Sequence, residues 1–167
     1  MSTPTLKDTF LAQVVDLLRE TFEGGLPGQG TQYLDHSSGI RSTLESLSAE
    51  EVSRRLEGHP SIAAHARHMN FHLRVTSEWI LGDHSRRDWV QSFEPQTVNA
   101  QEWERLKQDL EASRRELVRV IESLTPERFA EEGGAIGAIA HLAYHLGAIR
   151  QLMHRVRERR NEVGGKA

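Results

Sequence analysis

The sequence predicts an all-α protein built as a four-helix bundle. In four long segments apolar residues recur every three or four positions, the spacing of one buried helix face. No segment alternates apolar and polar residues as a half-buried strand does. Stretches with glycine and proline separate the four segments, as loops separate the helices of a bundle. We therefore expect helices over about residues 5–22, 60–81, 99–124 and 135–160, within a single domain of residues 1–167.

The first helix is expected over about residues 5–22. Its apolar positions are Phe10, Leu11, Val14, Val15, Leu17, Leu18 and Phe22. Its polar positions are Lys7, Asp8, Asp16, Arg19 and Glu20. Residues 24–39 hold five of the 13 glycines and should form a long loop. A short helix over about 48–56 should follow, because Ser48 and Glu51 have the spacing of a capping box.

The second and third long helices have clear start signals. Pro60 suits the first turn of the second helix, and Gly82 should end it. Its apolar stripe is Ile62, Met69, Leu73, Thr76 and Ile80. Asn99 can cap the third helix with Glu102 at the third helical position. Its buried seam should be Trp103, Leu106, Leu110, Leu117, Val120 and Leu124.

The last helix follows Gly133 and Gly134 and carries two histidines on its seam. Residues Ala138, His141, His145, Ala148, Leu152 and Val156 follow one another at separations of three or four. These are the a and d positions of a bundle helix, so His141 and His145 should point inward.

Five histidines lie on the second and last helices. They are His65, His68 and His72 in one and His141 and His145 in the other. Residues three and four apart are neighbours on a helix, so each set shares one face, and across a bundle the two sets would form an all-imidazole metal pocket. A single inward histidine is more often bonded to a carbonyl or carboxylate. Two of them one turn apart cost desolvation and repel if protonated, which favours His141 and His145 as metal ligands.

The third ligand must come from the second helix. At about 1.5 Å per residue, His65 and His72 lie about 10.5 Å apart along the axis. They cannot both reach one ion whose bonds to nitrogen are about 2.0–2.1 Å long. His68, the middle one, is the candidate by position, with His65 as the alternative. Histidines expected outside the cluster, in loops or on the surface, are His36, His59, His84 and His154.

Composition excludes several classes of site and partner. Lys and Arg total 21 against 24 Asp and Glu, a net charge of −3, so no nucleic-acid partner is expected. The arginines between residues 150 and 160 suit the end of a helix and are interrupted by Glu158.

The absence of cysteine leaves imidazole as the main metal ligand. The start MSTPTLKDTFLAQ has no signal-peptide or membrane-anchor pattern, so we expect a cytoplasmic protein without a membrane partner.

Two segments resemble the metal motifs of the DinB/YfiT-like family of metalloenzymes. In PSIAAHARHMNFHL, the residues Ser61, Ile62 and His68 match the register of the family's first motif. In AHLAYHLGAIRQL, the matching residues are His141, His145, Gly147, Ile149 and Arg150. Ala148 stands where the family often has glutamine. The resemblance extends from the first helix through Met153, and the last-helix motif is its most specific part.

The resemblance implies a fold and a site. It implies a four-helix bundle of up-down-down-up topology, often a homodimer, with a three-histidine metal site of His68, His141 and His145 facing a pocket. Some relatives are metal-dependent transferases or isomerases that use low-molecular-weight thiols. Three protein ligands leave a fourth position for water or substrate, as in catalytic zinc sites.

We therefore expect a metal-dependent enzyme acting on a small molecule, with thiol-dependent S-transferase-like or hydrolase-like chemistry. The expected cofactor is a divalent metal ion, zinc or nickel first, with a low-molecular-weight thiol as a cosubstrate. His72 is the candidate catalytic proton shuttle, with an ordinary pKa near 6.5. The alternative is a non-catalytic dimeric helical bundle with a structural or vacant metal site.

The three tryptophans divide by position. Trp79 and Trp103 lie on helical seams and are expected in the core. Trp89 lies in a polar segment and is the better candidate for a pocket or interface.

Overall fold

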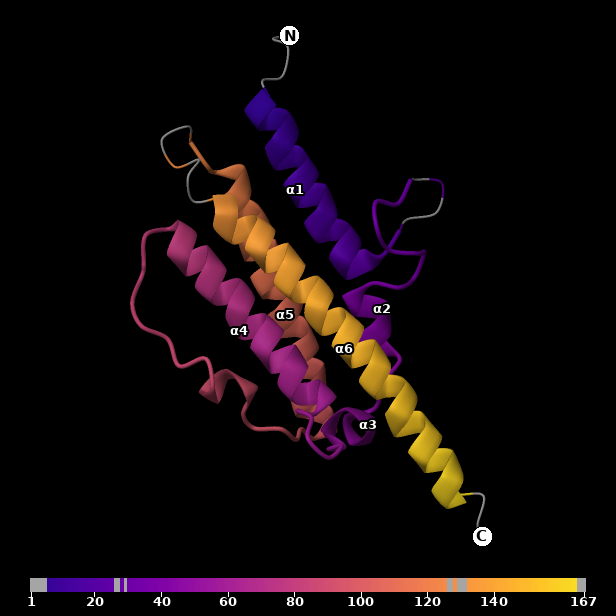
Figure 1. Cartoon of the computed structure of the whole chain (residues 1–167). Helices are drawn as coiled ribbons and strands as arrows, with labels where there is room; N and C mark the ends of the chain where they lie inside the picture. Colours follow the sequence, from indigo (N-terminus) through magenta and orange to yellow (C-terminus); the bar gives the residue numbers. More distant parts are fainter. Residues whose placement is uncertain (1–5, 26–27, 29, 126–127, 129–131, 165–167) are drawn as a thin grey trace.

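The computed structural model describes residues 6–25, 28, 30–125, 128 and 132–164. Over these residues it contains six α-helices and one short 3-10 helix, η1 (Figure 1). Their bounds are α1 Leu6–Glu23, α2 Ile40–Glu45, α3 Ala49–Ser53, α4 Ile62–Ile80, η1 Gln91–Phe93, α5 Ala100–Glu122 and α6 Glu132–Gly164. The predicted all-α class is confirmed. None of the helices in the described ranges has the length and apolar character needed to cross a bilayer.

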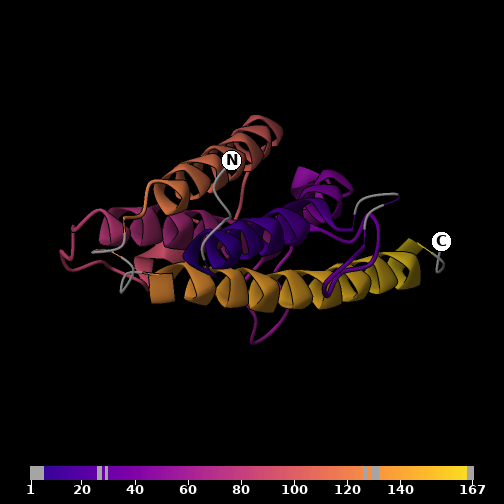
Figure 2. The ribbon, with the colours of Figure 1, turned by 90° about the horizontal axis from the view of Figure 1, so that it is seen from above.

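The four long helices lie lengthwise beside one another. Figures 1 and 2 show α1, α4, α5 and α6 in this arrangement, with α6 extending beyond the others at its C-terminal end. Helix α4 packs against both α5 and α6, and α1 also packs against these two helices. The connection between α4 and α5 passes along the outside of α4, where η1 contacts that helix (Figure 1). The histidine-bearing helices α4 and α6 are therefore neighbours.

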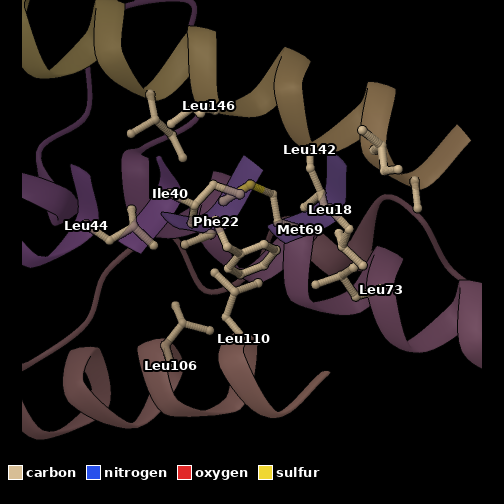
Figure 3. Packing of buried hydrophobic residues seen from close by; sticks show 14 of the residues in the cluster. Leu18, Phe22, Ile40, Leu44, Met69, Leu73, Leu106, Leu110, Leu142 and Leu146 are labelled. Carbon is tan, nitrogen blue, oxygen red and sulfur yellow. The ribbon is translucent and has the colours of Figure 1, made fainter. Parts of the chain in front are cut away.

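The core contains the apolar stripes that the sequence predicts. Leu18 and Phe22 of α1, Met69 and Leu73 of α4, and side chains of α5 and α6 meet in one cluster (Figure 3). The α4 stripe and the α5 seam are buried at every predicted position. Burial of such side chains supplies the main favourable free energy of folding, about 1.5–3 kcal/mol for each large one.

The predicted capping boxes are present in α3 and α5. Ser48 and Glu51 exchange side-chain and backbone hydrogen bonds at the start of α3. Asn99 and Glu102 do the same at the start of α5. Each box satisfies two backbone N–H groups that the first helical turn leaves without partners.

The ends of α4 are set by Ser61 and Gly82. Contrary to the prediction from its position, Pro60 does not lie in the first turn, because the helix begins at Ile62 and the Ser61 hydroxyl accepts a hydrogen bond from the Ala64 N–H. At the other end, Gly82 has φ +99° and its N–H donates to the carbonyl of Trp79, while Asp83 donates to Glu78. This is a Schellman motif, and its positive φ favours glycine.

Three further expectations from sequence need correction. Helix α2 was missed, since six residues are too few to show a helical period. Trp79 is not a core residue, because it is 49% exposed. Helix α6 does not follow Gly133 and Gly134 but begins at Glu132.

Glu20 does not lie on a solvated helix face. It is 8% exposed, and its carboxylate accepts backbone hydrogen bonds from Gln32, Tyr33 and Leu34 at 2.7–3.0 Å. Desolvation would raise the pKa of Glu20, but the three backbone donors outweigh it and lower the pKa. One carboxylate therefore fastens the long loop to α1.

Candidate metal centre

Three histidines from α4 and α6 meet at the contact between these helices. His68, His141 and His145 each offer one ring nitrogen, and the three nitrogens lie within 4.8 Å of one another. The ring centroid of His68 is 4.9 Å from that of His141 and 4.9 Å from that of His145. We call these three residues the histidine trio. The structure thus brings together the same three histidines that the sequence analysis named, and it forms a group that could hold a metal ion.

An unpaired nitrogen in the trio fits a bound cation. His141 Nε2 is buried and has no hydrogen-bond partner among the described residues. Leaving such a buried polar atom without a partner is costly. An all-imidazole donor set suits zinc, nickel, copper or iron. The residues present therefore fit a divalent metal ion.

The hydrogen bonds of His68 assign its protons. Ser92 Oγ donates its only hydrogen to the carbonyl of Trp89 at 2.5 Å. In the hydrogen bond of 2.5 Å between His68 Nδ1 and Ser92 Oγ, His68 must then be the donor. Neutral His68 consequently carries its proton on Nδ1 and keeps an unprotonated Nε2. An outer hydrogen bond of this kind is typical of metal-binding histidines.

His65 plays a comparable part for His145. The two Nδ1 atoms are 2.8 Å apart, so one of them donates to the other. For His145 to bind a cation through Nε2, its proton must be on Nδ1, and His65 is then the acceptor. The structure therefore places His65 beside a candidate ligand, while His68 belongs to the trio.

Flat ring contacts hold two members of the trio in orientation. His68 stacks on Phe93 of η1, with ring centroids 4.0 Å apart and planes 13° apart. His141 stacks on His72, with corresponding values of 3.9 Å and 14°. These contacts restrict rotation of both imidazoles before any ligand arrives.

The environment keeps these histidines neutral. Burial, and then the neighbouring histidines, lower the pKa of His145 to about 3 and that of His68 to about 4. Burial lowers the pKa of His141 as well. Neutral imidazole is the form that binds metal ions, so few protons compete with a cation at neutral pH.

His72 differs from its sequence-based description. Burial, and then His141 and His68, lower its pKa to about 4, so the expected value near 6.5 was wrong. Thr76 Oγ1 donates a hydrogen bond to the His72 carbonyl. His72 Nδ1 lies 3.3 Å from Thr76 Oγ1. With a pKa this low, the ring carries no charge at pH 7.

A cavity of about 660 Å³ opens beside the trio. It is lined by His59, Pro60, His65, His68, Phe93, His141, Tyr144, His145, Ala148, Gln151, Leu152 and Arg155. Its volume lies in the range of small-molecule sites. A second cavity of about 280 Å³, which includes Trp79 and Trp89, reaches His72 and His141 from another side. The trio is therefore accessible to a small ligand.

Sequence reasoning missed several residues around the trio. His59 was expected outside the cluster but lines the larger cavity. Ser92 and Phe93 lie in η1, a connection with no periodic pattern, so no sequence feature pointed to them. Trp89 was correctly proposed for a pocket, since it lines the smaller cavity and its ring centroid is 6.1 Å from that of His68.

Comparison with known families identifies the family of this chain. The family model of the DinB superfamily matches residues 32–158. The chain belongs to the DinB superfamily. The match includes α4, η1, α5 and residues 132–158 of α6, so all three histidines of the trio in this DinB-superfamily protein lie within the matched segment. Searches of curated proteins and of solved structures gave no match.

Proposed function

We propose that this protein is a divalent-metal-dependent enzyme in which His68, His141 and His145 hold the metal ion. The observation that carries the proposal is the convergence of three neutral imidazoles from two helices beside an open cavity. Membership of the DinB superfamily supports it. Thiol-dependent S-transferase-like chemistry is proposed first, and hydrolase-like chemistry second.

The number of ligands favours a catalytic ion over a structural one. Structural zinc sites usually have four protein ligands, whereas catalytic sites have three and leave a position open. The group found within the described residues has three members and contains no carboxylate. The 660 Å³ cavity gives a substrate access to that open position.

A divalent ion in this site would supply Lewis acidity that makes a coordinating thiol or water a nucleophile at neutral pH. The chain's own residues perform the remaining tasks. Ser92 and His65 hold the proton on Nδ1 of His68 and of His145, and Phe93 fixes the plane of His68. His72 is proposed as a proton acceptor, because its ring is stacked on that of His141 with centroids 3.9 Å apart.

Elemental analysis tests the metal site. Untagged protein purified without added metal is compared with His68→Ala, His141→Ala and the control His154→Ala, which alters an exposed histidine of the same helix. We expect about one ion per chain in the wild type and the control, and a loss of it in the two trio variants. Equal metal content in all four proteins would contradict the assignment.

A spectroscopic titration tests the chemistry. The Co²⁺-loaded protein is titrated with a low-molecular-weight thiol, and the visible spectrum is followed. A saturable change in the spectrum supports thiol chemistry. If no thiol or small electrophile binds, and a chelator only lowers the melting temperature, the non-catalytic bundle with a structural ion is favoured instead.

The finer architecture remains a prediction from the family resemblance. We propose the up-down-down-up course for the four long helices and a homodimer acting on a small-molecule substrate. Sedimentation of the full chain measures the oligomeric state directly.

A further inference from the structure

We infer that the ligand of the large cavity carries an anionic group, and that Arg155 binds this group at a distance from the histidine trio. The inference rests on the proposed function, because it concerns the substrate of the same site. It names a substrate class: small molecules with a metal-binding donor near one end and a carboxylate or phosphate near the other.

The charge of the cavity lining is the first observation. The chain has 24 acidic residues, yet none of the twelve residues that line the large cavity is Asp or Glu. Its ionisable side chains are five histidines, one tyrosine and Arg155. By contrast, the cavity between α2 and α5 is lined by Glu45, Glu104 and Glu111 together with basic residues. A lining without anions favours a ligand of negative charge.

The state of Arg155 is the second observation. Arg155 is exposed at the cavity, and no ion pair joins it to an acidic side chain in the part of the chain that the structure describes. Its neighbour Arg157 is engaged instead, with Glu51 at 3.3 Å and with the Ser46 carbonyl at 2.8 Å. The guanidinium of Arg155 is therefore free to form a bidentate contact with a carboxylate or phosphate.

The spacing along α6 limits the size of the ligand. At about 1.5 Å per residue, Arg155 lies about 15 Å beyond His145 along the helix axis. Side chains lean toward the helix N-terminus, which shortens the distance to the trio. Gln151 lies between His145 and Arg155 in the sequence, lines the same cavity and offers a polar group. A ligand that reaches both ends is therefore at most about as long as four extended peptide residues.

A series of synthetic thiols tests the inference. The Co²⁺-loaded full chain is titrated with ω-mercaptocarboxylates of increasing chain length, with the matching ω-mercaptoamides, and with ω-mercaptoalkyl phosphates. We expect carboxylates or phosphates of one optimal length to bind about tenfold more tightly than the amides, the size of one charge-assisted contact. The tighter of the two anions identifies the source of the charge.

Variants of Arg155 connect the preference to that residue. In Arg155→Gln the anion preference should disappear while the metal content and the affinity for the amides stay unchanged. Arg155→Lys should restore part of the preference, because it keeps the charge but loses the planar fork. The control Arg159→Gln changes another exposed arginine of α6 that lies outside the cavity lining, and should behave as the wild type. An equal preference in wild type and Arg155→Gln would overturn the inference.

A second readout separates this inference from the metal proposal. In ¹H–¹⁵N spectra of metal-stripped protein, the Arg155 Nε–H peak should shift with the carboxylates and not with the amides. If the protein binds no metal but the peak still shifts, the metal proposal fails and the anion site stands. If metal binds and the peak does not respond to any anion in either form, the anion site is refuted and the metal proposal stands.

Discussion

At the scale of single residues, the hydrogen bond at Nδ1 of His68 and of His145 decides whether Nε2 of the same ring is free to bind a cation. His68 Nδ1–H donates a hydrogen bond to Ser92 Oγ, which accepts it because the Ser92 hydroxyl donates its own hydrogen to the Trp89 carbonyl. His145 has His65 as its Nδ1 partner. The spacing of the histidines showed which helix faces they share, but their tautomers depend on partners from distant parts of the chain. The sequence could therefore name the trio and could not assign His65 its place.

His65→Ala should weaken metal binding without removing the site. Loss of a partner that orients a ligand typically lowers metal affinity about 10- to 100-fold. Competition with a fluorescent chelator measures this change, and the stoichiometry should stay at one ion. His59→Ala is the matched control, since His59 lines the same cavity but is exposed. Equal affinities of the two variants would show that the contact between His65 and His145 has no effect on the ion.

At the scale of elements, the irregular connection between α4 and α5 completes a site that the helices begin. It supplies Ser92 to His68 and places Phe93 flat against the same ring. The long helices were predictable because burial repeats every three or four residues over many turns. The connection was not, because its residues are selected by contacts with α4 and show no period. Trp79 was not predictable either. Its place beside the α4 stripe suggested that it is buried, but no neighbouring helix covers it.

Ser92→Ala should lower metal affinity about tenfold, while Ser92→Thr should retain most of it. Alanine removes the acceptor that holds the His68 proton on Nδ1, whereas threonine keeps a hydroxyl at the same place. Calorimetric titration with Zn²⁺ measures both variants, and melting curves check that each is folded. A threonine variant as weak as the alanine variant would mean that the shape of the loop matters and the hydroxyl does not.

Glu20→Gln should destabilise the protein at pH 7 by about 1–3 kcal/mol, the cost of weakening charge-assisted hydrogen bonds at a buried carboxylate. Because the folded-state pKa of Glu20 is lowered, its contribution is present above the unfolded pKa of about 4.3 and is lost as the pH falls through the folded value. Urea unfolding at pH 7 and at pH 3 should therefore show a smaller difference between wild type and variant at pH 3. Glu23→Gln, which alters a carboxylate of the same helix outside this contact with the loop, serves as the control. A difference that does not change with pH would assign the effect to packing.

At the scale of the whole molecule, the trio joins two helices that are far apart in sequence. Helices α4 and α6 pack along their length, and His68 on one faces His141 and His145 on the other. An ion held by all three would bind the folded chain much more tightly than the unfolded chain. Metal binding and global stability are then coupled, whether or not the ion also takes part in catalysis.

The melting temperature should accordingly rise with metal. A free ion at 100 times its Kd adds about 2.7 kcal/mol, which corresponds to roughly 5–10 °C for a chain of this size. Calorimetric scans with Zn²⁺ and with excess chelator measure the shift. His154→Ala should shift as the wild type does, whereas a variant with alanine at all three trio positions should not respond to either addition. Since that variant also loses buried side chains, only its response to metal is compared and not its absolute melting temperature. A metal-dependent shift of equal size in the triple variant would place the ion elsewhere in the protein.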